Sequence, residues 1–126
     1  MEIKFKKLTK TAKTPTRDTR KSAGFDIYAD IAAPIVISPN TTVKIRTGIA
    51  MTPPEGHFAA IFARSSMSTK RGLAPSCKVG IRSEDFTGEY VIGLHNHSDE
   101  SQILEVGEKI AQIVFIPYAV GDLVEE

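Results

Sequence analysis

Short apolar runs separated by turn-forming residues are the feature that most narrows the possible folds of this chain. No window of ten residues repeats apolar side chains with the 3.6-residue period of an amphipathic helix. Instead, eight or nine runs rich in β-branched residues are separated, at intervals of roughly 8–12 residues, by Gly, Pro, Asn, Ser or Asp. This pattern predicts an all-β sandwich or barrel.

Strand and turn signals can be placed along most of the sequence. Ile3 and Phe5 alternate with lysines, which is strand periodicity. Residues 7–21 are polar and basic, so we expect a surface connection there. Residues 53–56 (PPEG) have turn composition, because proline fixes φ at the start of a turn and glycine accepts the positive φ with which many turns end.

At most one short helix is expected, near residues 65–71. The sequence RSSMSTKRG lacks strand alternation and ends in Gly72, a residue that commonly terminates helices. If Ser65 or Ser66 opens this helix, its first amides and the guanidinium of Arg64 favour an anion. A solvated surface turn is the alternative interpretation of the RSS triplet.

Length and composition limit the kind of protein. A chain of 126 residues with 41% apolar residues is predicted to form one domain, residues 1–126. The net charge of +1 provides no long-range field for nucleic acid or an anionic membrane. No apolar run approaches the ~18 residues of a membrane span. The single cysteine fits a reducing compartment, so we expect a soluble cytoplasmic protein.

Polar residues within apolar runs are the first candidates for a site. Asp26 either caps the backbone amides of a turn or faces a ligand. Gln112 lies in the apolar run from Ile110 to Phe115 and must find partners, either structural or in a ligand.

Two clusters of titratable residues are further candidates. Glu84, Asp85 and Glu89 lie between two predicted strands, where each carboxylate either belongs to a hairpin tip or activates water. His95 and His97 would need a third ligand to hold a metal ion, and the sequence offers only one further histidine. We therefore predict no direct metal site.

The order and spacing of four segments resemble the first four of the five motifs of the trimeric dUTPase family. These segments are AGFDIYA, RSS…KRGL, VGI…DFTGE…LHN and GEKIAQIVF, and the resemblance extends from Ile3 to Val124. It implies a distorted jelly-roll β-barrel that forms a homotrimer with active sites between subunits. It also implies hydrolysis of dUTP to dUMP and pyrophosphate, with Mg²⁺ bound through the triphosphate.

The resemblance assigns the phosphate end of the site. Arg64, Ser65 and Ser66 match the phosphate-binding second motif. Gln112 matches the glutamine of the fourth motif, which also faces the phosphates. Asp26 matches the aspartate of the first motif, which supports the region of the metal and the phosphates.

The resemblance also assigns the nucleoside end. The hairpin from Cys77 to Phe86 would hold uracil through backbone groups, in a cleft too narrow for a 5-methyl group. Cys77, Gly80 and Ile81 are the predicted contacts to the base. Phe86 stands where relatives have a tyrosine that packs against deoxyribose.

The water-activating aspartate of the family is missing. Gly80 and Gly88 fix the register, which places Ser83 in the position of that aspartate and retains Asp85 two residues later. A serine hydroxyl has no useful basicity at neutral pH. If strand alternation continues, Glu84 points to the opposite face and Asp85 lies roughly 6–7 Å further along. We therefore predict that no carboxylate replaces the base directly.

Two functional hypotheses follow. The first is a dUTP pyrophosphohydrolase impaired at Ser83. The alternative is a catalytically inactive or engineered homologue that binds deoxyuridine nucleotides as a sensor or regulatory binder, and Arg82 at a usually aliphatic position mildly favours it. A pure protein-recognition scaffold is disfavoured, because the matches at the phosphate end are retained. The sequence ends at GDLVEE, where the family's glycine-rich arm would begin.

Overall fold

Eleven β-strands and one short helix make up the chain, whose residues 1–126 are all described by a computed structural model. Every strand pair is antiparallel. The all-β prediction is confirmed. The elements are β1 Lys4–Lys7, β2 Phe25–Tyr28, β3 Ile35–Ile37, β4 Thr42–Arg46, β5 Ile49–Thr52, β6 His57–Phe62, α1 Ser65–Arg71, β7 Leu73–Pro75, β8 Gly80–Arg82, β9 Val91–Asn96, β10 Gln102–Leu104 and β11 Lys109–Pro117.

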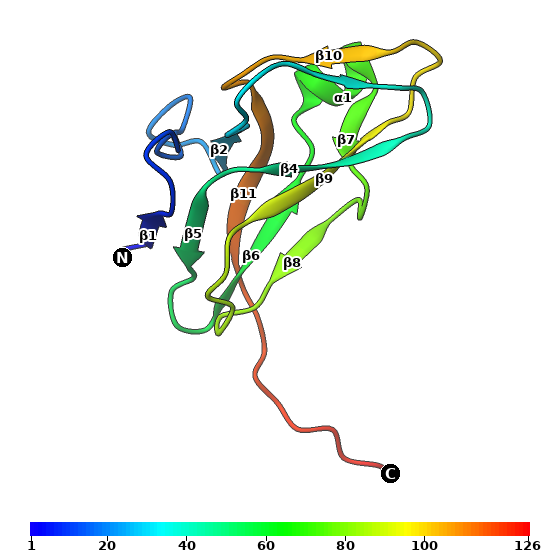
Figure 1. Cartoon of the computed structure of the whole chain (residues 1–126). Helices are drawn as coiled ribbons and strands as arrows, with labels where there is room; N and C mark the ends of the chain where they lie inside the picture. The colour runs from blue at the N-terminus through cyan, green and yellow to red at the C-terminus, as the bar shows by residue number, and fades with distance from the viewer.

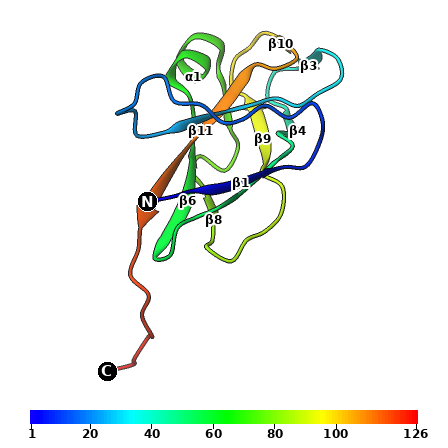
Figure 2. The same cartoon turned by 90° about the vertical axis from the view of Figure 1, so that its left-hand side faces the viewer.

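The strands form two larger and two smaller sheets. The larger sheets have the strand orders β2-β11-β6-β8 and β4-β9-β7, and the smaller sheets pair β1 with β5 and β3 with β10. Figures 1 and 2 show these sheets wrapped around a common interior. The buried residues that fill it are mainly branched aliphatics, which suit pleated surfaces. The largest are Ile27, Ile37, Ile45, Ile49, Ile61, Leu73, Tyr90, Leu94, Leu104, Ile110 and Ile113.

The strand count exceeds the eight or nine expected. One reason is Gly48, which has a φ of 66° and divides the β-branched run of residues 41–51 into β4 and β5. A Cβ atom at Gly48 would lie 2.7 Å from a carboxylate oxygen of Asp30, so this corner has no space for a side chain. Another reason is that β7 has only three residues, too few for an alternation pattern to be recognised.

The predicted helix is confirmed at residues 65–71. It ends at Gly72, whose φ of 67° places it in the left-handed region, and the Gly72 amide bonds the carbonyl of Ser68 at 3.1 Å. α1 has seven residues, and the chain contains no helix with the length and apolarity needed to cross a membrane.

The register of β6 and β8 places two parts of the predicted site at opposite ends of the barrel. Ala59 pairs with Arg82, so the turn after β8 lies beside the start of β6. The helix α1 follows the other end of β6, roughly 20 Å away for a six-residue strand. In Figures 1 and 2, α1 lies at the top, whereas the β8–β9 turn and the extended segment 118–126 lie at the bottom.

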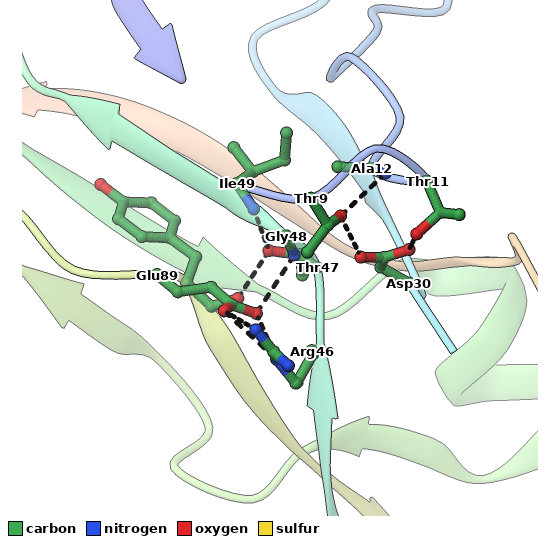
Figure 3. A network of polar contacts seen from close by, with 10 residues as sticks. Thr9, Thr11, Ala12, Asp30, Arg46, Thr47, Gly48, Ile49 and Glu89 are labelled. Atoms are coloured by element: carbon green, nitrogen blue, oxygen red, sulfur yellow. Dashed lines mark hydrogen bonds and ion pairs between the residues drawn. The ribbon is translucent and has the colours of Figure 1, made fainter. Parts of the chain in front are cut away.

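A polar network fixes the end of the β8–β9 turn to the corner between β4 and β5 (Figure 3). The Glu89 carboxylate accepts hydrogen bonds from Arg46 Nη2 at 2.8 Å and from the Gly48 amide at 3.1 Å. The Thr47 hydroxyl donates to the carbonyl of Tyr90 at 2.6 Å. The hydrogen bond from Arg46 is the main reason why the pKa of Glu89 lies below its usual value.

We expect Glu89→Gln to destabilise the protein in a pH-dependent way. Because the folded-state pKa of Glu89 is lowered, its carboxylate stabilises the fold above the unfolded-state pKa, and this contribution disappears as the pH falls through the folded-state pKa. At pH 7 the melting temperature should fall by roughly 3–6 °C. The deficit should shrink between about pH 5 and pH 3.

Thermal unfolding followed by circular dichroism measures this deficit at each pH. Glu55→Gln is the matched control, because the exposed Glu55 side chain has no hydrogen-bond partner or ion pair in the chain. A deficit of equal size at pH 7 and pH 3 would show that the carboxylate charge is not what stabilises this corner.

Candidate functional site

A small polar cavity lies where β2, β11 and the start of α1 meet. Its volume is about 130 Å³, and no apolar side chain lines it. The register explains the convergence, because Gln112 of β11 pairs with both Asp26 of β2 and Phe62 at the end of β6. We call this cavity the cradle, and its lining residues are Asp18, Asp26, Arg64, Ser65, Ser66 and Gln112.

Ion pairs order the cationic wall of the cradle. Asp26 is 7% exposed, and its Oδ1 accepts a hydrogen bond from Arg64 Nε at 3.0 Å. Its Oδ2 lies 3.4 Å from Lys109 Nζ, which also lies 3.4 Å from Asp18. The hydrogen bond to Asp18, followed by the one to Asp26, raises the pKa of Lys109. The carboxylate of Asp26 therefore fixes Arg64 through Nε, while neither Nη atom has a partner in the chain.

The start of α1 and Gln112 complete the cradle. Arg64 is the N-cap residue of α1, and no side chain caps the first turn. The Met67 amide bonds the Arg64 carbonyl, so the amides of Ser65 and Ser66 are the ones available to an anion. Gln112 Nε2 donates to the carbonyl of Ala63 at 2.9 Å, which fixes the orientation of the amide. Gly24 permits this placement, because a Cβ atom there would lie only 2.6 Å from Gln112 Oε1.

A larger cleft opens between β8 and β9. Its volume is about 700 Å³, and its lining includes Cys77, Gly80 and Ile81 together with Ile61 of β6 and residues of β4, β7 and β9. β8 is an edge strand, with β6 as its only strand neighbour. Its outer backbone groups are therefore not used in a strand ladder, and the Ile81 carbonyl accepts a hydrogen bond from Arg82 Nη1 at 3.2 Å. We call this cleft the β8 cleft.

Arg82 closes the β8 cleft toward the β8–β9 turn. Its Nη2 donates to the carbonyl of Val91 at 3.2 Å, so it links β8 to β9. Its guanidinium carbon lies 5.5 Å from the ring centroid of Phe86 and 5.8 Å from that of Tyr90. Burial raises the pKa of Tyr90 to about 12. The charge of Arg82 thus has carbonyl and aromatic partners within the chain.

Residues 83–86 form a turn, and the expectation of continued strand alternation is wrong here. β8 ends at Arg82, and the amide of Phe86 bonds the carbonyl of Ser83 at 3.0 Å. Ser83, Glu84 and Asp85 line the same concavity, because a turn does not send successive side chains to opposite faces. The inference from strand parity that separated these side chains therefore fails.

Two of the three acidic side chains near this turn have partners in the chain. Glu84 Oε2 accepts hydrogen bonds from the Gly56 amide at 3.2 Å and from the Tyr118 hydroxyl at 2.9 Å. Glu89 is held by Arg46 at the β4–β5 corner. Asp85 has neither a side-chain hydrogen bond nor an ion pair in the chain. Asp85 is thus the carboxylate left free beside Ser83.

The chain brings together some predicted site residues and separates others. Asp26, Arg64, Ser65, Ser66 and Gln112 meet in the cradle. The Asp26 side chain forms ion pairs with Arg64 and Lys109 and does not cap a turn. Arg64 is held by Asp26 and does not lie on a solvated surface turn. The remaining predicted residues lie around the β8 cleft and the turn, at the other end of β6: Cys77, Gly80, Ile81, Ser83, Asp85 and Phe86.

Sequence reasoning missed Asp18 and Lys109 as members of this region. Asp18 belongs to the polar connection of residues 7–21, where no periodicity distinguishes one side chain from another. The contact that brings it here is the bridge between Thr16 and Asp26, which pairs residues ten positions apart. No local signal in the sequence predicts that pairing.

The antiparallel jelly-roll, the polar cradle beside a short helix and the edge-strand cleft together describe a class of small all-β proteins. Comparison with known proteins narrows this class. The dUTPase family model matches residues 10–125, and the chain belongs to the dUTPase family. The resemblance inferred from the four motifs is therefore confirmed.

Individual relatives support the same assignment. The deoxyuridine 5'-triphosphate nucleotidohydrolase of Desulfitobacterium hafniense (strain DSM 10664 / DCB-2) is 35% identical over 123 residues, which cover 97% of this chain and 82% of that protein. The structure of the Staphylococcus bacteriophage 80alpha dUTPase with dUPNHPP has a TM-score of 0.89 at 26% identity, covering 99% of this chain and 88% of that one.

A more distant structural neighbour shows the fold alone. A mutant dUTPase from phage phi11 of S. aureus, whose structure reveals the coordination of a structural Mg(II) ion, has a TM-score of 0.90 at 22% identity. The match covers 100% of this chain and 97% of that one. These neighbours confirm the predicted dUTPase-like jelly-roll.

Proposed function

We propose that this protein binds dUTP and converts it to dUMP and pyrophosphate at a rate limited by the absence of a general base. The observation that carries the proposal is the cradle, in which Arg64 is oriented by Asp26 and faces hydroxyls and an uncapped helix turn. A guanidinium fork with two free Nη atoms suits the paired oxygens of a phosphate.

The cradle would hold the phosphates by charge and geometry together. Asp26 contacts both Arg64 and Lys109, so its negative charge is balanced before a polyphosphate arrives. The hydroxyls of Ser65 and Ser66 and the amide of Gln112 add neutral donors. Such preorganised donors stabilise the charge that develops during phosphoryl transfer.

We expect Gly24→Ala to weaken nucleotide binding. The new Cβ atom would lie 2.6 Å from Gln112 Oε1, so the amide must leave its place in the cradle. The affinity for dUTP, measured by calorimetry, should fall roughly 10-fold. Gly121→Ala is the control, because nothing lies within 4 Å of a Cβ atom at that position. An unchanged affinity for Gly24→Ala would mean that Gln112 does not contact the phosphates.

The β8 cleft would hold the uracil ring. Cys77, Gly80 and Ile81 line this cleft, and the free edge of β8 offers backbone groups that would bind the polar edge of the ring. Phe86 lines the adjoining concavity and would pack against the deoxyribose. A closely fitting cleft would reject the 5-methyl group of thymine by overlap.

A homotrimer would bring the two halves of the site together. Within one chain, the cradle and the β8–β9 turn lie at opposite ends of β6 and have no lining residue in common. The cradle of one subunit facing the hairpin of the next would complete the site, and a closed cyclic arrangement would repeat it three times.

Mg²⁺ would arrive with the nucleotide as part of the substrate. The chain has no group of three or more His, Cys, Asp or Glu side chains arranged to hold a metal ion. Both carboxylate oxygens of Asp26 already contact cations, and Asp18 is the other carboxylate of the cradle. Phosphate oxygens and water are ligands that Mg²⁺ favours, and the bound ion would neutralise phosphate charge.

Proton transfer is the step at which this chain differs from its family pattern. Hydrolysis forms a bond from a water oxygen to the α-phosphorus and breaks the bond to pyrophosphate, and the water proton must pass to a base. Ser83 cannot accept that proton at neutral pH. Glu84 and Glu89 are already bound by other groups, which favours the alternative function of a deoxyuridine-nucleotide sensor or regulatory binder. Asp85 is the one carboxylate beside Ser83 that has no partner in the chain, and it would be the base if the protein turns over dUTP quickly.

Nucleotide selectivity tests the binding function without requiring turnover. Calorimetry with Mg²⁺ compares a non-hydrolysable dUTP analogue with its thymidine counterpart. We expect the deoxyuridine analogue to bind at least about 100-fold more tightly, because the family resemblance implies a uracil cleft too narrow for a 5-methyl group. Equal binding of the two analogues, or binding of neither, would contradict the proposal.

A further inference from the structure

The turn that carries Ser83 and Asp85 is held at both ends by other parts of the chain. After the turn, Glu89 and Tyr90 are fixed to the β4–β5 corner. At its start, Glu84 Oε2 accepts two hydrogen bonds, from the Gly56 amide and the Tyr118 hydroxyl. The turn itself contributes one internal backbone bond, from the Phe86 amide to the Ser83 carbonyl.

Tyr118 is well placed to hold Glu84. Its backbone amide donates to the carbonyl of Gly56 at 3.1 Å. Its ring meets the ring of Phe58 edge to face, with centroids 6.1 Å apart and an interplanar angle of 72°. Two anchors thus fix the ring, and the hydroxyl reaches Glu84 across 34 positions of sequence.

Tyr118 also connects the turn to the C-terminal segment. It is the first residue after β11, where the chain leaves the barrel as an extended segment (Figure 1). Tyr118, Ser83, Glu84 and Asp85 line one concavity of about 410 Å³. Tyr118 lines neither the cradle nor the β8 cleft, so it lies outside the groups that would contact phosphate or base.

We propose that Glu84 and Tyr118 form a latch that positions the 83–86 turn, and with it the side chains of Ser83 and Asp85. The proposal deepens the proposed function, on which its catalytic consequence rests. A single internal hydrogen bond leaves a four-residue turn with several accessible conformations. The latch selects one of them by tying the turn to the β5–β6 connection and to the end of β11. The raised pKa of the Tyr118 hydroxyl, caused mainly by its bond to Glu84, agrees with this contact.

Hydrogen exchange of the Phe86 amide tests the latch without nucleotide. This amide donates the one bond inside the turn, so its exchange rate by NMR reports how often the turn opens. We expect Tyr118→Phe and Glu84→Gln each to raise this rate about fivefold. In the double variant the rate should rise no further than in the stronger single variant, because both changes act on the same contact: Tyr118→Phe removes the donor, and Glu84→Gln replaces a charged acceptor with a weaker neutral one.

Matched substitutions elsewhere serve as controls. Tyr28→Phe removes another hydroxyl hydrogen bond, 2.6 Å long to Thr16, and Glu55→Gln neutralises an exposed carboxylate near Gly56. Neither should change exchange at Phe86. If Glu84→Gln fails to fold, Tyr118→Phe carries the test alone, since it removes only one exposed hydroxyl. Unchanged exchange in the latch variants, or increases that add in the double variant, would overturn the proposal.

Turnover of dUTP distinguishes a positioning role from a purely structural contact, because a purely structural contact would not change kcat. With Ser83→Asp as the parent, adding Tyr118→Phe should lower kcat about fivefold and change KM less than twofold, because Tyr118 lies outside the cradle and the β8 cleft. A loosened turn with unchanged kcat would overturn the positioning role. If no variant binds dUTP, the proposed function fails, and exchange at Phe86 still decides whether the latch exists.

Discussion

Replacing Arg64 with alanine should reduce the affinity for a non-hydrolysable dUTP analogue by at least about 100-fold. A charge-assisted hydrogen bond contributes roughly 1.5–3 kcal/mol, and the guanidinium of Arg64 offers two free Nη groups to the phosphates. Arg64→Lys should recover only part of the loss, because an ammonium group keeps the charge but cannot bind two oxygens as a planar fork.

Arg20→Ala is the control for this experiment. Arg20 is exposed, has no ion pair in the chain and lies in the same basic segment as Asp18. The variant changes the net charge by the same amount as Arg64→Ala, so a general electrostatic effect would reduce both affinities equally. If Arg64→Ala binds the analogue as tightly as Arg20→Ala does, the cradle is not the phosphate site.

Replacing Ser83 with aspartate should raise the rate of pyrophosphate release from dUTP by roughly 10²–10⁴-fold, which is the usual contribution of a general base. The affinity for the nucleotide should change little, because Ser83 lies at the β8–β9 turn and not in the cradle. Ser83→Asn is the matched control, since it has nearly the size of aspartate without its basicity.

Asp85 is the other residue that could activate water, and the variant Asp85→Asn distinguishes a base at position 85 from a base at position 83. Its carboxylate is free of partners and lines the same concavity as Ser83. If the unmodified chain is already fast and Ser83→Asp adds little, Asp85→Asn should abolish turnover. Faster turnover in Ser83→Asn, equal to that in Ser83→Asp, would exclude a base at position 83 as the cause.

The sequence predicted the architecture better than the geometry of the site. Strand periodicity and turn composition correctly indicated an all-β fold, and the glycine at position 72 correctly ended the helix. The division of residues 41–51 into two strands was missed, because it depends on the positive φ of Gly48 and on the carboxylate of Asp30, which leaves no space for a side chain there.

At the site, the resemblance to the dUTPase family suggested roles for residues whose local sequence patterns allowed more than one interpretation. Asp26 was compatible with a turn cap, and only the structure shows its contacts with Arg64 and Lys109. The alternation of side chains expected for a strand is absent at residues 83–86, because these residues form a turn. Glu84 in this turn is bonded to Gly56 and Tyr118, which are distant in the sequence. Such long-range contacts leave no periodic signature in a sequence.

The central claim is that the chain retains a deoxyuridine-nucleotide site but lacks its general base. The most direct test measures the affinity for a non-hydrolysable dUTP analogue and pyrophosphate release from dUTP with Mg²⁺, on this chain and on Ser83→Asp side by side. We predict equal affinities and a release rate at least about 100-fold higher for Ser83→Asp. Fast release by both proteins, or no binding of the analogue by either, would contradict the claim.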